Sequence, residues 1–182
     1  MKATQPTVIY FGHDSAGYGP PKVFLRTLLY STAKRGRVIQ SMRATLARGD
    51  VRHSFHIWVY GDKSLLRGSG LFVGETGVAA NHHFMNPNDG GFSFVEGVYE
   101  LEIVAQLVGD KQPITLLTQT LEVTRDLAAA LEDHLAGLYF DWGPDSRYVS
   151  HIDKRSVAPS PEALMKLIGD ARSLGEAKDE VS

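Results

Sequence analysis

Two neighbouring stretches of the chain alternate between apolar and polar residues, and this pattern constrains the fold more than any other feature. Over residues 37–47 the even positions are mostly apolar, and over residues 51–60 the odd positions are. The apolar sets are Val38, Met42, Ala44 and Leu46 in the first stretch, and Val51, Phe55, Ile57 and Val59 in the second. A period of two places alternate side chains on opposite faces of a strand. Residues 47–50, with Gly49, are a short connection, so we predict an antiparallel hairpin with one buried face.

A second hairpin is predicted over residues 98–124. Residues 98–108 place Tyr99, Leu101, Ile103, Ala105 and Leu107 on one side. Residues 109–113 turn the chain, and residues 114–124 return with Leu117, Leu121 and Val123 as the inward set. Shorter strands are expected over residues 7–11, 23–31, 65–73 and 78–84 and, closing the sheet, within residues 137–152.

Helical segments are expected only late in the chain. Residues 125–134 are rich in good helix formers, and Thr124 can cap their first turn. A C-terminal helix is predicted from about Pro161 to Ser173, followed by a charged tail. We therefore predict a mainly β fold, an antiparallel β-sandwich with a short helix after residue 124 and a C-terminal helix. Residues 1–155 form one domain that includes the closing aromatic segment, and residues 156–182 form the helix and tail.

The segment LLYSTAKRGRVIQSMRATL, residues 28–46, is similar to the strand, turn and strand that begin immunoglobulin-like and fibronectin-III-like sandwiches. The resemblance is one of architecture and implies only the sandwich fold. The Cys, Trp, Cys pattern of antibody domains is absent, so no functional residue is carried over. A barrel or a jelly roll fits the same strand pattern.

Composition removes several classes of chemistry. The chain has no cysteine, which excludes a disulfide framework, a cysteine-based zinc site and a thiol nucleophile. No membrane span and no secretory signal are visible, so a cytoplasmic location is expected. No P-loop, no H-E-x-x-H zinc motif and no G-x-S-x-G nucleophile motif occurs.

The charge is unevenly distributed along the chain. Residues 1–60 hold nine Lys or Arg against two Asp, a net charge of +7, which leaves −9 for the remainder. The basic side chains predicted to form a surface for an anionic partner are Lys34, Arg35, Arg37, Arg43, Arg48 and Arg52. Nucleic acid is a possible but not a favoured partner, because the isoelectric point is near 6.4. The alternative interpretation is that these charges protect edge strands from aggregation.

Histidines supply the candidate metal site. His53, His56, His82 and His83, together with Asp89, could be brought together across strands and hold a divalent metal for a hydrolase. No other cofactor is predicted. Neighbouring side chains on a strand point to opposite faces, which works against a shared metal. The alternative interpretation therefore makes His53 a hydrogen-bonded core residue on the apolar face of its strand.

Residues 138–148 are dense in aromatic and charged side chains, which suits a carbohydrate or a nucleotide. The candidate ligand-binding residues are Tyr139, Asp141, Trp142, Asp145 and Arg147. The alternative interpretation is a hydrophobic plug that closes one end of the sandwich. Weighing these patterns, we expect a non-catalytic interaction module, not an enzyme, which binds a protein partner or associates with itself as a homo-oligomer.

Overall fold

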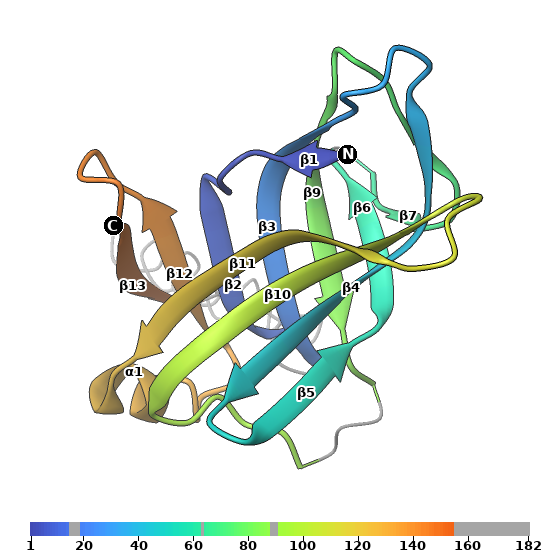
Figure 1. Cartoon of the computed structure of the whole chain (residues 1–182). Helices are drawn as coiled ribbons and strands as arrows, with labels where there is room; N and C mark the ends of the chain where they lie inside the picture. The colour runs from blue at the N-terminus through green and yellow to red at the C-terminus, as the bar shows by residue number, and fades with distance from the viewer. Residues whose placement is uncertain (15–18, 63, 88–90, 155–182) are drawn as a thin grey trace, which may run out of the picture.

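The predicted strands form two antiparallel sheets in the computed structural model of the chain (Figure 1). The structure describes residues 1–14, 19–62, 64–87 and 91–154. The mainly β fold class is confirmed, and the two-sheet arrangement is that of a sandwich. The predicted C-terminal helix, tail and domain boundary lie outside the described residues.

The larger sheet has the strand order β13-β12-β2-β3-β9-β6-β7, and β1 pairs with β3. Its strands are β1 (Lys2–Ala3), β2 (Val8–His13), β3 (Pro21–Tyr30), β6 (Ile57–Gly61), β7 (Leu66–Arg67), β9 (Val78–Met85), β12 (Ala136–Trp142) and β13 (Tyr148–Lys154). Residues 137–152 thus form the strand pair that closes one side of this sheet, as predicted.

The smaller sheet has the order β11-β10-β4-β5, and β8 also pairs with β4. Its strands are β4 (Arg37–Arg48), β5 (Val51–Phe55), β8 (Leu71–Val73), β10 (Gly97–Leu107) and β11 (Ile114–Val123). The helix α1 (Arg125–Ala130) follows β11 directly. The Thr124 hydroxyl accepts a hydrogen bond from the backbone N–H of Leu127, which confirms the predicted cap.

The first hairpin is confirmed, with one shift of register. β4 pairs antiparallel with β5 from Ala44 to Arg48. Against β10, however, Ser41 pairs with Gln106 and Ile39 with Leu107, so Gln40 has no partner residue and forms a β-bulge. The bulge reverses the alternation, and Ile39 is buried in place of the predicted Val38.

The prediction of one strand over residues 51–60 is wrong. The chain breaks at His56, so β5 belongs to the smaller sheet and β6 to the larger one. Beyond the break Trp58 is 3% exposed and joins the core, whereas Ile57 and Val59 are only partly buried. Val51 is 50% exposed. Residues 65–73 likewise divide into β7 and β8, one in each sheet.

The second hairpin is confirmed, although the predicted inward residue Leu117 is only partly buried. β10 and β11 pair antiparallel, and the predicted inward residues of β10 are all buried. The register shifts between Ile103 and Val104, which leaves Leu116 of β11 as a bulge. The stretch from Leu117 to Val123 is therefore the regular part of β11.

One apolar core fills the space between the sheets. Phe11 of the larger sheet stacks on Phe94 with ring centroids 5.3 Å apart and meets the edges of Tyr99 and Phe140. Burial of such side chains supplies most of the stabilisation, about 1.5–3 kcal/mol for each large apolar residue. With the core closed between the sheets, the functional surfaces lie at strand edges and on outer faces.

Candidate functional site

The four edges of the two sheets differ in how well they are protected. β7 has only two residues, and β13 carries His151, Asp153 and Lys154. The short strands β5 and β8 share one edge of the smaller sheet, and β5 includes Arg52. Short edges and edge charges both discourage pairing with another chain.

β11 has little of this protection, since Glu122 near its end is its one charged residue. It is ten residues long, and the run 114–121 (ITLLTQTL) contains no charged residue and no proline. Within the part of the chain that the structure describes, β10 is the only strand that pairs with it. A bulge at Leu116 interrupts the first part of the strand, and the side-chain amide of Gln119 donates to the carbonyl of Thr120 at 2.9 Å. The regular stretch from Leu117 onward is therefore the edge best suited to accept another strand.

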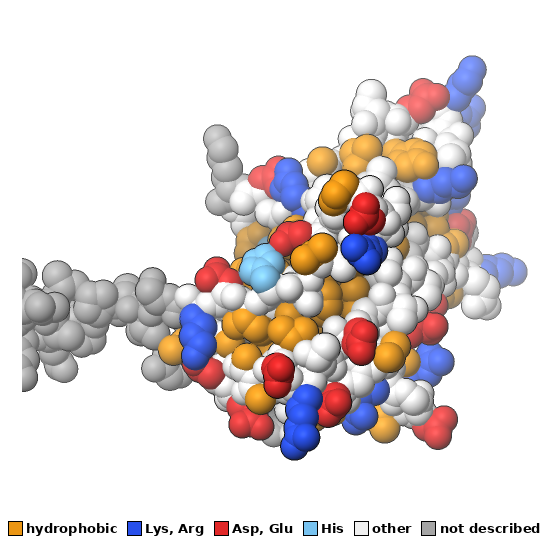
Figure 2. Space-filling view, turned by 90° about the vertical axis from the view of Figure 1, so that its left-hand side faces the viewer, with side chains coloured by type: hydrophobic (Ala, Val, Ile, Leu, Met, Phe, Trp, Pro, Cys, Tyr) orange, Lys and Arg blue, Asp and Glu red, His pale blue; other side chains and the backbone are white. Residues whose placement is uncertain are grey.

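A groove adjoins this edge, between β11 and the β12–β13 hairpin. Its volume is about 500 Å³. Figure 2 views the molecule from the side of these strands and shows hydrophobic side chains gathered there with charged side chains around them. The lining residues are Gln119, Thr120, Leu121, Glu122, Thr124, Phe140, Trp142, Ser146, Arg147, Tyr148 and Ser150. Both sheets thus contribute a wall.

A hydrogen-bond network holds the two walls together. The amide of Gln5 donates to the side-chain oxygen of Gln119 at 2.8 Å and to the hydroxyl oxygen of Tyr148 at 2.9 Å. That hydroxyl donates to the carbonyl of Pro6 at 2.8 Å. Burial raises the pKa of Tyr148 to about 12, so the phenol stays neutral. β11, β13 and the N-terminal segment are therefore fixed relative to one another.

Of the predicted ligand-binding residues, the groove brings two together. Trp142 is 38% exposed and meets the edge of the Tyr148 ring at 5.0 Å, and Arg147 lies beside it. Tyr139 does not line the groove, because its ring packs against Tyr10 and His151.

The two aspartates of the predicted segment have partners of their own. Asp141 contacts His151 at 3.1 Å, and the exposed Asp145 pairs with Arg147 at 3.2 Å. Neither aspartate lines the groove.

The predicted metal ligands are separated. His82 is fully buried, and its Nδ1 accepts a hydrogen bond from the indole N–H of Trp58 at 3.2 Å. The next residue, His83, packs against Phe24 with ring centroids 4.7 Å apart. Burial, and to a smaller extent His83, lowers the pKa of His82 to about 4, so His82 is neutral at pH 7.

The other two histidines lie away from this pair. His53 is on β5 of the smaller sheet and contacts the Phe92 ring, while His56 is exposed at the break before β6. Asp89 lies outside the described residues. Among the residues that are described, no three His, Asp or Glu side chains are placed to hold a metal. The metal hypothesis stays a prediction.

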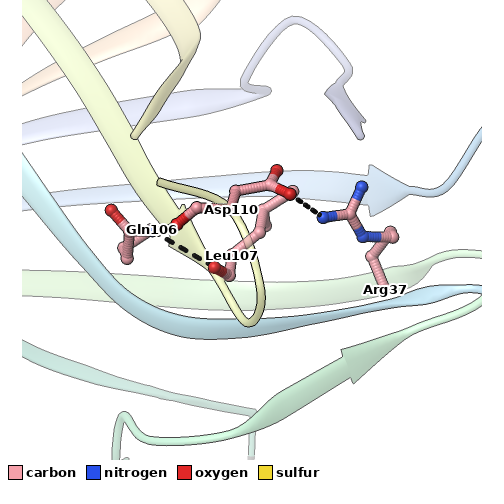
Figure 3. A network of polar contacts seen from close by, with 4 residues as sticks. All are labelled: Arg37, Gln106, Leu107 and Asp110. Carbon is pink, nitrogen blue, oxygen red and sulfur yellow. Dashed lines mark hydrogen bonds and ion pairs between the residues drawn. The ribbon is translucent and has the colours of Figure 1, made fainter. Parts of the chain in front are cut away.

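The six predicted basic residues do not form one patch. Arg37 and Arg48 stand at opposite ends of β4, roughly 35 Å apart at about 3.3 Å per residue. Arg37 pairs with Asp110 at 2.6 Å, and the amide of Gln106 donates to the carbonyls of Asp110 and Leu107 beside it (Figure 3). Arg48 lies against Gly97. The remaining four are distributed between the loop before β4, β4 itself and β5.

The uncharged edge of β11 is the feature that the sequence analysis missed. Its signal is present as the run ITLLTQTL, but only the strand order shows that this run lies at an edge.

No protein-family model, curated protein or solved structure matches the chain. No helix among the described residues is long and apolar enough to cross a membrane.

Proposed function

We propose that the protein is a non-catalytic interaction module that binds an extended protein segment as an additional strand on β11. The observation that carries the proposal is the long edge of β11, which is uncharged over residues 114–121. A strand added to a sheet edge gains main-chain hydrogen bonds, and its alternate side chains give specificity. The cytoplasmic location and the immunoglobulin-like kind of sandwich belong to the same proposal.

The groove supplies the specificity that an edge alone lacks. Residues Gln119 to Glu122 line it from the β11 side, and Trp142 lines it from the opposite wall. Every second side chain of an added strand points towards one face of the sheet. Apolar residues at those positions would meet the exposed indole, and aromatic side chains such as this one are enriched at binding hot spots.

Selection of peptides tests the proposal directly. Phage-displayed random dodecapeptides are selected on the full chain, with the double variant Thr118→Lys/Thr120→Lys used for counter-selection because edge lysines discourage strand pairing. We expect enrichment of peptides with alternating apolar residues and no internal proline. In isotope-labelled protein these peptides should shift the backbone amide resonances of Leu117 to Leu121.

Two controls make the selection decisive. Trp142→Ala should weaken binding of the selected peptides, whereas Phe72→Ala, which removes an even more exposed aromatic side chain from β8, should not. Failure to enrich any peptide over the counter-selection variant, or amide shifts confined to another edge, would refute the proposal.

The groove also favours a second candidate, a carbohydrate. Trp142 is partly exposed and lines the groove together with Gln119, Thr120 and Ser150. The groove therefore combines an aromatic surface with residues that carry amide and hydroxyl groups. The groove is lined by one negative residue, Glu122, and one positive residue, Arg147, so their charges cancel. Arg147 also forms an ion pair with Asp145. That balance suits a neutral, hydroxyl-rich ligand better than a nucleotide phosphate.

Tryptophan fluorescence distinguishes this candidate. Trp58 is buried in the core, so a change in emission on adding maltose, cellobiose or diacetylchitobiose would come from Trp142. We expect a saturable change that Trp142→Phe abolishes. A flat titration with all three sugars would rule the carbohydrate out, and a response to ATP alone would assign the groove to a nucleotide.

A further inference from the structure

Five residues within the regular part of β11 read the same in both directions. Residues 117–121 are Leu, Thr, Gln, Thr and Leu, centred on Gln119. We propose that the strand bound at this edge is β11 of a second copy of the chain, paired antiparallel about a two-fold axis at Gln119. This inference rests on the proposed function, because it names the partner of the same edge.

The two-fold register places like residues opposite each other. Gln119 faces Gln119 of the second copy, each Thr118 faces a Thr120, and each Leu117 faces a Leu121. Cross-strand Thr–Thr pairs and pairs of apolar residues are favourable in antiparallel sheets. A two-fold interface uses the same surface on both copies and closes, so it yields a dimer and not a filament.

The charges on the strand permit this register. No charged residue lies between Leu117 and Leu121, and Glu122 would face Leu116 of the other copy rather than its own equivalent. The threonines are exposed, whereas Leu121 is buried, so pairing leaves the inward face of β11 in the core. The dimer would join the two five-stranded sheets into one continuous sheet.

Pairing through the five residues 117–121 covers little surface, which predicts a weak dimer. Interfaces at the small end of the usual range are transient. We therefore expect a dimer whose population rises with protein concentration.

Sedimentation velocity of the full chain over a range of concentrations tests the pairing, and two double variants test the register. Thr118→Lys/Thr120→Lys would place lysines opposite lysines across the two-fold axis and should raise the dimer dissociation constant about tenfold or more. Within one chain these positions pair with Glu102 and Glu100, so the fold should tolerate the lysines. Thr118→Lys/Thr120→Glu should restore the dimer, because opposite charges then face each other.

A cross-linking measurement keeps the test valid if either double variant is unstable. The chain has no cysteine, so a single introduced thiol reports only its own position. Gln119→Cys should form a disulfide-linked dimer under mild oxidation, because residues directly opposite in an antiparallel pair lie about 4.5–5.5 Å apart, within disulfide reach. Thr115→Cys, which would face Val123 of the other copy, should not.

Each result of these experiments supports or overturns the two-fold pairing of β11. A monomer at every concentration would overturn the second copy as partner, yet leave strand addition of another protein intact. A dimer that survives the two lysines, or that cross-links equally through Thr115→Cys, would overturn the register. Selected peptides that fail to map to β11 would instead overturn the proposed function itself.

Discussion

At the scale of single residues, the arrangement of His82 has a consequence for stability. The imidazole is fully buried, accepts a hydrogen bond from Trp58, and has a pKa lowered to about 4. An unfolded histidine has a pKa near 6.5. Because the folded pKa is the lower one, the unfolded state binds the proton more tightly, and acid favours unfolding.

We predict that this stabilisation is complete above about pH 6.5 and is lost as the pH falls towards 4. The loss is about 3 kcal/mol in the free energy of unfolding. Urea unfolding at several pH values measures it. His82→Gln should flatten the pH dependence between 6.5 and 4, whereas a control substitution at an exposed histidine, His56→Gln, should not produce that flattening. An unchanged slope in the first variant would show that His82 does not control it.

Residue types alone predicted part of the groove. The aromatic segment indicated a ligand site, and Trp142 and Arg147 do line the groove. Tyr139 does not, because it is an odd number of positions from Trp142 on the same strand and faces the other way. Gln5 and Gln119 were not foreseen, since they meet across 114 residues of sequence.

At the scale of elements, alternation predicted both hairpins because each has one buried face and a short turn. It did not predict the break at His56, where no glycine or proline interrupts the β pattern of VRHSFHIWVY. The break results from packing. It allows Phe55 to enter the core from the smaller sheet and Trp58 to enter the core from the larger sheet. The bulge at Gln40 is similar, since only the pairing with β10 reveals the extra residue.

At the scale of the whole molecule, sequence patterns could not show which strand is an edge. β10 and β11 are neighbours in sequence and pair with each other, but the place of β11 depends on β4 pairing with the opposite side of β10. That long-range pairing leaves β11, uncharged over residues 114–121, at the border of the smaller sheet. It lies next to a groove whose other wall comes from the larger sheet. Function is therefore proposed from strand order, a property of the folded chain.

Hydrogen exchange at low and high protein concentration is the sharpest test that two copies of the chain pair through β11. Backbone amides of an edge strand exchange more slowly once another strand covers them. Pairing at β11 predicts slower exchange for amides within Leu117 to Leu121 at high concentration, with no change in β13 or β5. Equal exchange of β11 at all concentrations, or new protection at β13 or β5, would contradict it.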